Sequence, residues 1–258
     1  MSGFKLVKTK MMNRYLLNFI VRLFIFVTVF VLYLSRKEML IGILTHKFSI
    51  GIESYGITFL HLVWAFFMVM MIRHLVPGKT LSMALRKNEE ENYVEVEGYS
   101  ELELAKFIQD QNVKAWTVML LWLCFNALWG ILYLYGILDV ADLLMLTVFY
   151  FLCDYICILF FCPFQKVIMK NKCCVNCRIY DWGHFMMFTP MLFIQNFFSW
   201  SLFFTSLVVL IRWEIVYAKN PRRFWSGSNK TLQCANCKDK TCQIKKKLSK
   251  QKENLKIL

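Results

Sequence analysis

One segment decides the topology of this chain, residues 185–217, which read FMMFTPMLFIQNFFSWSLFFTSLVVLIRWEIVY. A helix of about 20 apolar residues crosses the roughly 30 Å hydrocarbon core of a bilayer. The segment is long for one crossing and barely long enough for two. Pro190 and the polar residues Gln195, Asn196 and Ser199 interrupt it. We therefore expect either one long tilted helix, or a broken helix or hairpin whose polar tip is buried in protein.

The rest of the chain contains four clearer apolar spans. The sequence is 58% hydrophobic and 17% aromatic, and a soluble domain does not need several apolar runs of about 20 residues. The first span is longer than a signal-peptide core and lacks a small-residue cleavage site, so it is interpreted as a retained anchor. The sequence predicts an all-α polytopic transmembrane helical bundle with spans at 15–34, 56–76, 115–138 and 140–161, plus the segment 185–217.

The segments between the spans define the expected organisation. In the insert, residues 92–98 alternate like a strand, and residues 100–111 look like a short helix with Ser100 and Glu103 in a capping-box pattern. We divide the chain into a basic segment 1–14, two spans at 15–76 with an interfacial loop 35–55, an acidic soluble insert 77–114, a transmembrane hairpin 115–162, a Cys-rich loop 163–184, the segment 185–218 and a basic tail 219–258.

Positive charge is concentrated beside the apolar spans. The net charge is +14, and the tail 219–258 holds twelve Lys or Arg against Asp239 and Glu253. The positive-inside rule places the N-terminus and the loop 163–184 in the cytoplasm of a multi-pass cell-membrane protein, and the tail with them if 185–217 turns back. Anionic lipid headgroups are the expected partner, with a membrane or cytoplasmic protein as a second, whereas nucleic acid is disfavoured.

Paired cysteines give the clearest chemical signal. A C-x-x-C turn places two sulfurs where they can bind one tetrahedral ion, and neighbouring cations favour the thiolate form. About 56 residues separate the two pairs, against roughly 15–20 in compact zinc modules. The predicted ligands of zinc or an iron–sulfur cluster are Cys173, Cys174, Cys177, Cys234, Cys237 and Cys242, with His184 as a weaker candidate for a further ligand.

A second polar group lies inside the predicted fourth span. Cys153 and Cys157 share one face of a helix, and Asp154 is an intramembrane acid. These residues could form a pathway for a soft metal. Alternatively, the cysteines pack as small apolar residues, and Asp154 pairs with Arg22 or meets a polar group such as Asn126.

The sequence therefore predicts an integral membrane protein with a thiolate metal site on its cytoplasmic face, acting in scaffolding, sensing or electron transfer. One alternative is a membrane thiol–disulfide oxidoreductase that uses the two C-x-x-C pairs. The other is a soft-metal transporter that uses the intramembrane cysteines and Asp154. No phosphate-binding loop, nucleophile elbow or zinc-protease helix occurs in the sequence.

Overall fold

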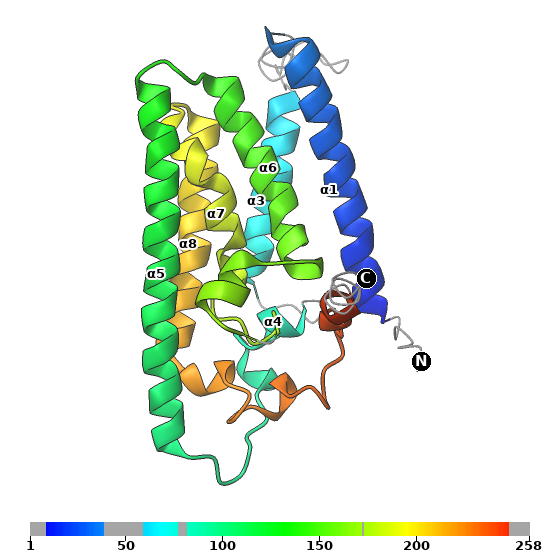
Figure 1. Ribbon diagram of the computed structural model, residues 1–258, viewed down its shortest axis with the longest axis vertical. Coiled ribbons are helices and arrows are strands. Elements are labelled where there is room, and N and C mark those ends of the chain that lie inside the picture. Colours follow the sequence, from blue (N-terminus) through cyan, green and yellow to red (C-terminus); the bar gives the residue numbers. More distant parts are fainter. Residues whose placement is uncertain (1–8, 39–58, 77–81, 172, 248–258) are drawn as a thin grey trace, which may run out of the picture.

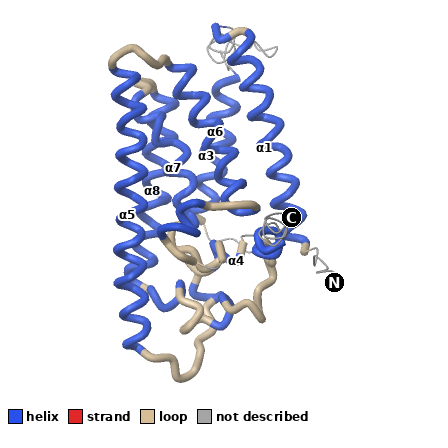
Figure 2. The backbone as a smooth tube through the Cα atoms, viewed as in Figure 1, coloured by secondary structure: helices blue, strands red, loops and turns tan. Residues whose placement is uncertain are grey.

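The computed structural model describes residues 9–38, 59–76, 82–171 and 173–247. Within these ranges the chain forms helices and turns, and no strand (Figures 1 and 2). The predicted interfacial loop 35–55 and the two ends of the chain lie largely outside the described residues. What is described forms a bundle of long helices with a smaller group of turns at one end (Figure 1).

Among the described residues, four helices are long and apolar enough to cross a membrane. They are α1 (Lys10–Ser35), α5 (Glu101–Leu134), α6 (Val140–Leu159) and α8 (Phe197–Lys219). A fifth apolar helix, α3 (Phe59–Leu75), has 17 residues, fewer than the predicted span at 56–76. The described residues are all helices and turns, and their membrane-length helices are those expected of a multi-pass bundle. One of these helices, α8, comes from the segment 185–217.

The segment 185–217 turns back on itself. Helix α7 (Gly183–Phe188) continues into the 3-10 helix η4 (Thr189–Phe193), and α8 then returns the chain to the end from which α7 started (Figure 1). The side chain of Asn196 accepts a hydrogen bond from Ser199 N at 2.7 Å and caps α8. The single tilted helix is therefore wrong. Of the polar residues expected to be buried at the tip, Ser199 is buried, whereas Gln195 and Asn196 are exposed.

The short arm of this hairpin occupies the middle of the bundle. Its residues Phe185, Met187, Phe188 and Met191 are buried in the main hydrophobic core, together with residues of α5, α6 and α8. Helix α5 approaches η4 at Gly130, where an added Cβ would collide with the ring of Phe193. The short arm formed by α7 and η4 is therefore packed against other helices, although it is shorter than a full membrane crossing.

Helix α5 joins two elements that the sequence analysis separated. Ser100 caps it as predicted, accepting a hydrogen bond from Glu103 N at 3.4 Å. The helix then continues for 34 residues through both the expected short helix and the third span. The prediction of a separate helix at 100–111 is wrong, because no Pro or Gly interrupts the helical pattern before residue 115.

The acidic insert docks against the basic tail. Lys230 N donates to Val94 O at 2.8 Å, Val96 N donates to Ser228 O at 3.0 Å, and an ion pair joins Arg223 to Glu90 at 2.8 Å. The expected strand at 92–98 is wrong within the described residues, where one isolated bridge joins Glu95 to Asn229. Small helices frame this contact: α4 (Met83–Arg86), η1 (Glu90–Asn92), η5 (Pro221–Phe224) and η6 (Lys230–Leu232).

Candidate functional site

The tail and the Cys-rich loop meet at one end of the bundle. The loop begins with the π-helix η2 (Phe164–Ile168) and ends with the 3-10 helix η3 (Tyr180–Trp182). From the tail, Lys245 Nζ donates to Cys174 Sγ at 2.9 Å, to Gln165 Oε1 at 2.7 Å and to Cys157 O at 2.6 Å. Because α8 returns the chain, two segments about 70 residues apart share one site.

Four thiols lie in this region, and we call them the thiol cluster: Cys162, Cys173, Cys174 and Cys242. Lys245 contacts Cys174 and acts electrostatically on Cys162 and Cys242. The thiols of Cys173 and Cys242 are in contact, which joins the loop to the tail. The Cys162 sulfur accepts a hydrogen bond from Gln165 N at 3.4 Å and contacts the thiol of Cys157. All four are described as free thiols.

The electrostatics of the cluster favour thiolates at two positions. Contact with the Cys173 thiol, together with Lys246 and Lys245, lowers the pKa of Cys242 although burial opposes this. The pKa of Cys162 is lowered chiefly by the Cys157 thiol, with help from Gln165 N and Lys245. Burial raises the pKa of Cys174 despite its contact with Lys245. Thiolates are the reactive and metal-binding form of cysteine.

The predicted ligand set is only partly brought together. Cys173, Cys174 and Cys242 belong to the thiol cluster, whereas Cys177 is buried in the core. Cys237 packs beside Val175, and Cys234 is exposed. Among the described residues, no three His, Cys, Asp or Glu side chains are arranged to hold a metal ion. The six-residue metal site therefore stays a prediction.

Lys87 holds the C-x-x-C turn of the loop from the side of the insert. Its Nζ donates to Val175 O at 2.8 Å and to Cys177 O at 2.7 Å, and it lies 5.3 Å from the ring centroids of Trp213 and Phe224. Burial lowers the pKa of Lys87 to about 8. Sequence reasoning missed both Lys87 and Lys245, because each is one lysine among many in a soluble segment.

The intramembrane acid is neutralised within the bundle. Arg22 Nη1 lies 2.8 Å from Asp154 Oδ2 and donates to Phe151 O at 2.6 Å. The guanidinium also lies about 4.0 Å from the ring centroid of Tyr155. This arrangement matches the interpretation in which Asp154 pairs with Arg22. The sequence could suggest it, because charged residues inside apolar spans have few available partners.

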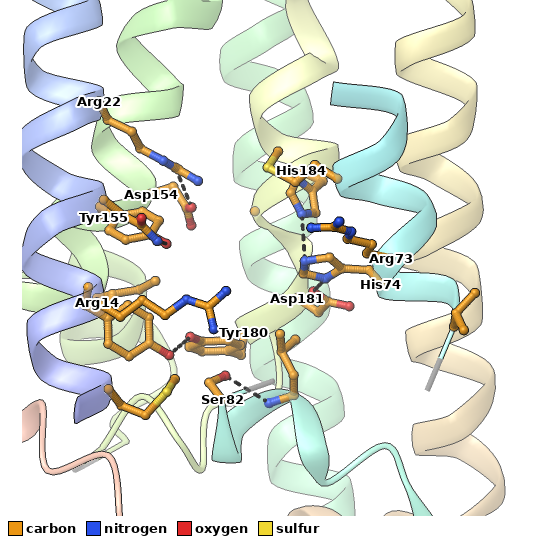
Figure 3. Close-up of a pocket in the computed structure, with 18 residues that line it drawn as sticks. Arg14, Arg22, Arg73, His74, Ser82, Asp154, Tyr155, Tyr180, Asp181 and His184 are labelled. Atoms are coloured by element: carbon orange, nitrogen blue, oxygen red, sulfur yellow. Dashed lines mark hydrogen bonds and ion pairs between the residues drawn. The ribbon is translucent and has the colours of Figure 1, made fainter. Parts of the chain in front are cut away.

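Two histidines and an aspartate form a second contact network beside that ion pair. His74 Nδ1 lies 2.7 Å from Asp181 Oδ1, and His74 Nε2 lies 3.3 Å from His184 Nε2 (Figure 3). His184 thus faces α3, which differs from its expected role beside the cysteines. Both networks line one cavity of about 610 Å³, which we call the polar cavity. No sequence motif signals this network.

Comparisons with family models, with curated proteins and with solved structures gave no match to this chain. Function is therefore inferred from the arrangement of its side chains alone. That arrangement offers two places for chemistry, the thiol cluster and the polar cavity. The first carries four thiols and a half-buried ammonium, and the second carries guanidinium, imidazole and carboxylate groups.

Proposed function

We propose that this integral membrane protein binds a soft metal, zinc or an iron–sulfur cluster, through thiolates where the Cys-rich loop meets the tail. Its role is scaffolding, sensing or electron transfer at the cytoplasmic face. The observation that carries the proposal is the position of Lys245, whose ammonium is held by the Cys174 sulfur and by the oxygens of Cys157 and Gln165.

A group that holds an ammonium ion has the polarity needed to hold a metal cation. Zinc and iron–sulfur centres are commonly bound by four thiolates, and the thiol cluster has four sulfurs. The proposed ligands are therefore the four cysteines of the thiol cluster. Compared with the set predicted from the sequence, Cys162 is added, and Cys177, Cys234 and Cys237 are left out. Loading requires Lys245 to withdraw and the sulfurs to close around the ion. Metal binding would thereby change the position of the tail, which suits a sensing role.

Charge supports the cytoplasmic placement. The loop carries Lys166 and Lys170, and the tail carries ten net positive charges. Basic segments next to spans are retained on the cytoplasmic side. There they also attract anionic headgroups, so the metal site would lie at the lipid surface.

Elemental analysis with an absorption spectrum tests the proposal on full-length protein purified in detergent without chelators. We expect zinc, or iron with visible absorption, near one site per chain. Cys174→Ser and Cys242→Ser should each remove most of the metal, because a four-thiolate site rarely tolerates loss of a ligand. The matched control is Cys234→Ser, which changes an exposed cysteine of the same tail and should keep the metal.

Metal-free protein whose cluster thiols all react freely with an alkylating reagent would contradict the proposal. Equal metal loss in Cys234→Ser and Cys242→Ser would instead favour the original six-cysteine set. Lys245→Met should not lower the metal content, because the proposal treats this lysine as a placeholder for the cation rather than as a ligand.

A thiol–disulfide oxidoreductase is the second candidate, and one observation favours it. The thiols of Cys173 and Cys242 are in contact, and the pKa of Cys242 is lowered, as in reactive dithiol pairs. Mass spectrometry under oxidising conditions would then find a reversible Cys173–Cys242 disulfide and no metal. The transporter alternative gains no comparable support, because Arg22 already occupies Asp154.

A further inference from the structure

The polar cavity offers a second site, which the proposed metal chemistry does not use. Its walls come from α1, α3, α6 and the chain around η3 and α7, and its volume is about 610 Å³. Cavities of roughly 300–1,000 Å³ typically hold small molecules or cofactors. Side chains from four parts of the chain point into this one (Figure 3).

The lining carries one more positive charge than negative charges. Arg14, Arg22 and Arg73 face the cavity against the two carboxylates Asp154 and Asp181. Both carboxylates already have close partners, since Asp154 lies 2.8 Å from Arg22 and Asp181 lies 2.7 Å from His74. The lining residues therefore carry more positive than negative charge before any imidazole is protonated. Arg14 and Arg73 are both exposed, so this excess lies where the cavity opens to its surroundings, and it favours an anionic occupant there.

The donors of the lining are those that recognise phosphate. In Figure 3 the guanidinium of Arg14 lies above the ring of Tyr180, and Ser82 lies below it. The guanidinium of Arg73 extends toward His74 and His184 from the other side (Figure 3). Arginine presents a planar fork of N–H donors that matches phosphate oxygens, and hydroxyl donors complete such sites.

We propose that the polar cavity binds a phosphate-bearing anion, either as a free ion or as the headgroup of a phospholipid. Arg14 and Arg73 contact the phosphate from opposite sides, and the Arg22–Asp154 pair fixes the wall between them. A phospholipid can supply the phosphate, because α1 and α3 also carry exposed apolar side chains, including Leu17 and Phe66. An acyl chain can lie against such surfaces.

A metal ion is the competing occupant. The 3.3 Å separation of His74 Nε2 and His184 Nε2 is compatible with two ligands of one ion. However, no third ligand completes such a group among the described residues. Three guanidinium groups line the same cavity and would repel a cation. The His–His contact is therefore assigned to a hydrogen bond, in which His74 is oriented by Asp181.

Binding to the full-length protein in a neutral detergent tests the proposal. Native mass spectrometry and calorimetry would measure three ligands: inorganic phosphate, phosphatidylglycerol, and diacylglycerol, which lacks the phosphate. We expect saturable binding of phosphate or phosphatidylglycerol and none of diacylglycerol. Phosphate binding identifies the free-ion source, and binding of phosphatidylglycerol alone identifies the lipid source.

Arg14→Gln and Arg73→Gln should each weaken the binding about tenfold or more, the usual effect of losing a charged hydrogen bond. Arg73 is exposed, so its substitution should not impair folding, which a melting curve would verify. Arg36→Gln, at the far end of α1, is the matched control and should bind like the wild type. Cys242→Ser should also bind normally, which separates this site from the thiol cluster.

Failure of the wild type to bind either phosphate-bearing ligand would overturn the proposal. So would wild-type affinity in both Arg14→Gln and Arg73→Gln. Binding that appears only when zinc is added would reassign the cavity to a metal held by His74 and His184.

Discussion

At the scale of single residues, buried charge is the main constraint on this molecule. Arg22 is only 8% exposed and lies in an otherwise apolar helix, where Asp154 and the Phe151 carbonyl compensate it. A buried pair adds little net stability compared with apolar residues, but removing one partner leaves an uncompensated charge. The pair therefore specifies how α1 docks on α6 more than it strengthens the fold.

Asp154→Asn should destabilise the protein by about 3–5 kcal/mol, because Arg22 keeps its charge without a carboxylate. The double variant Arg22→Met, Asp154→Leu should be much less affected. Melting temperatures in detergent measure both. As a control, Asp110→Asn removes an exposed pair with Lys114 and should change stability by less than about 1 kcal/mol. A double variant less stable than Asp154→Asn would contradict the account.

Lys87 should make stability depend on pH in the alkaline range. Its pKa is about 8 in the folded protein against the 10.5 of an ordinary lysine, so the unfolded chain binds more protons between these values. Stability from this residue therefore rises with pH from 8 towards 10.5 and is absent below that range. Lys87→Met should remove this rise, whereas Lys106→Met on the exposed face of α5 should keep it.

Urea titrations of the three proteins at several pH values would measure the difference. An unchanged pH dependence in Lys87→Met would show that its amine is not buried as described.

Residue-level contacts were predictable only where candidates were few. The sequence suggested the Arg22–Asp154 pair because both charges interrupt apolar spans. It could not pair His74 with Asp181 and His184, which lie 107 and 110 residues further along the chain in segments rich in polar groups. Lys245 was missed, because it belongs to no spaced motif, and Cys162 was left out of the predicted ligand set because it belongs to no C-x-x-C pair.

At the scale of elements, the hairpin formed by α7, η4 and α8 depends on close packing against α5. Gly130 allows this approach, because any Cβ there would overlap the ring of Phe193. The buried hydrogen bond from Trp122 Nε1 to Thr189 Oγ1, at 3.1 Å, lies on the same interface. The absence of a side chain at Gly130 therefore allows the short arm to pack against α5.

Gly130→Val should lower stability by about 1–3 kcal/mol through overpacking against Phe193. Ala127→Val, on the exposed face of the same helix, should have little effect. Thermal melting in detergent compares the two variants. If Gly130→Val has the same melting temperature as Ala127→Val and the wild type, η4 does not pack against α5 as described.

Hydropathy predicted the long helices well, because a membrane-length apolar run has few other structures open to it. Pro190 and the polar residues after it correctly indicated a break in 185–217. Helix α5 was divided wrongly, because a change from polar to apolar composition does not end a helix. The exposure of Gln195 and Asn196 was missed because it depends on where the hairpin ends within the bundle.

At the scale of the whole molecule, the hairpin brings both cysteine-bearing segments to one end. The tail contacts the insert through Arg223 and Glu90 and contacts the loop through Lys245 and Cys174. Insert, loop and tail therefore form one polar layer beneath the helices (Figure 1). Without the turn at 194–196, the thiol cluster could not form, and neither the metal proposal nor its oxidoreductase rival would have a site.

Site-directed labelling with a membrane-impermeant maleimide tests this claim most directly. In a background without reactive cysteines, single cysteines would be placed by Lys166→Cys in the loop, by Gln195→Cys at the hairpin tip and by retaining Cys234 in the tail. We predict that the loop and tail positions are labelled from the same side of oriented membranes and the tip from the other. Labelling of the loop and the tail from opposite sides would show that 185–217 crosses once and would contradict the account.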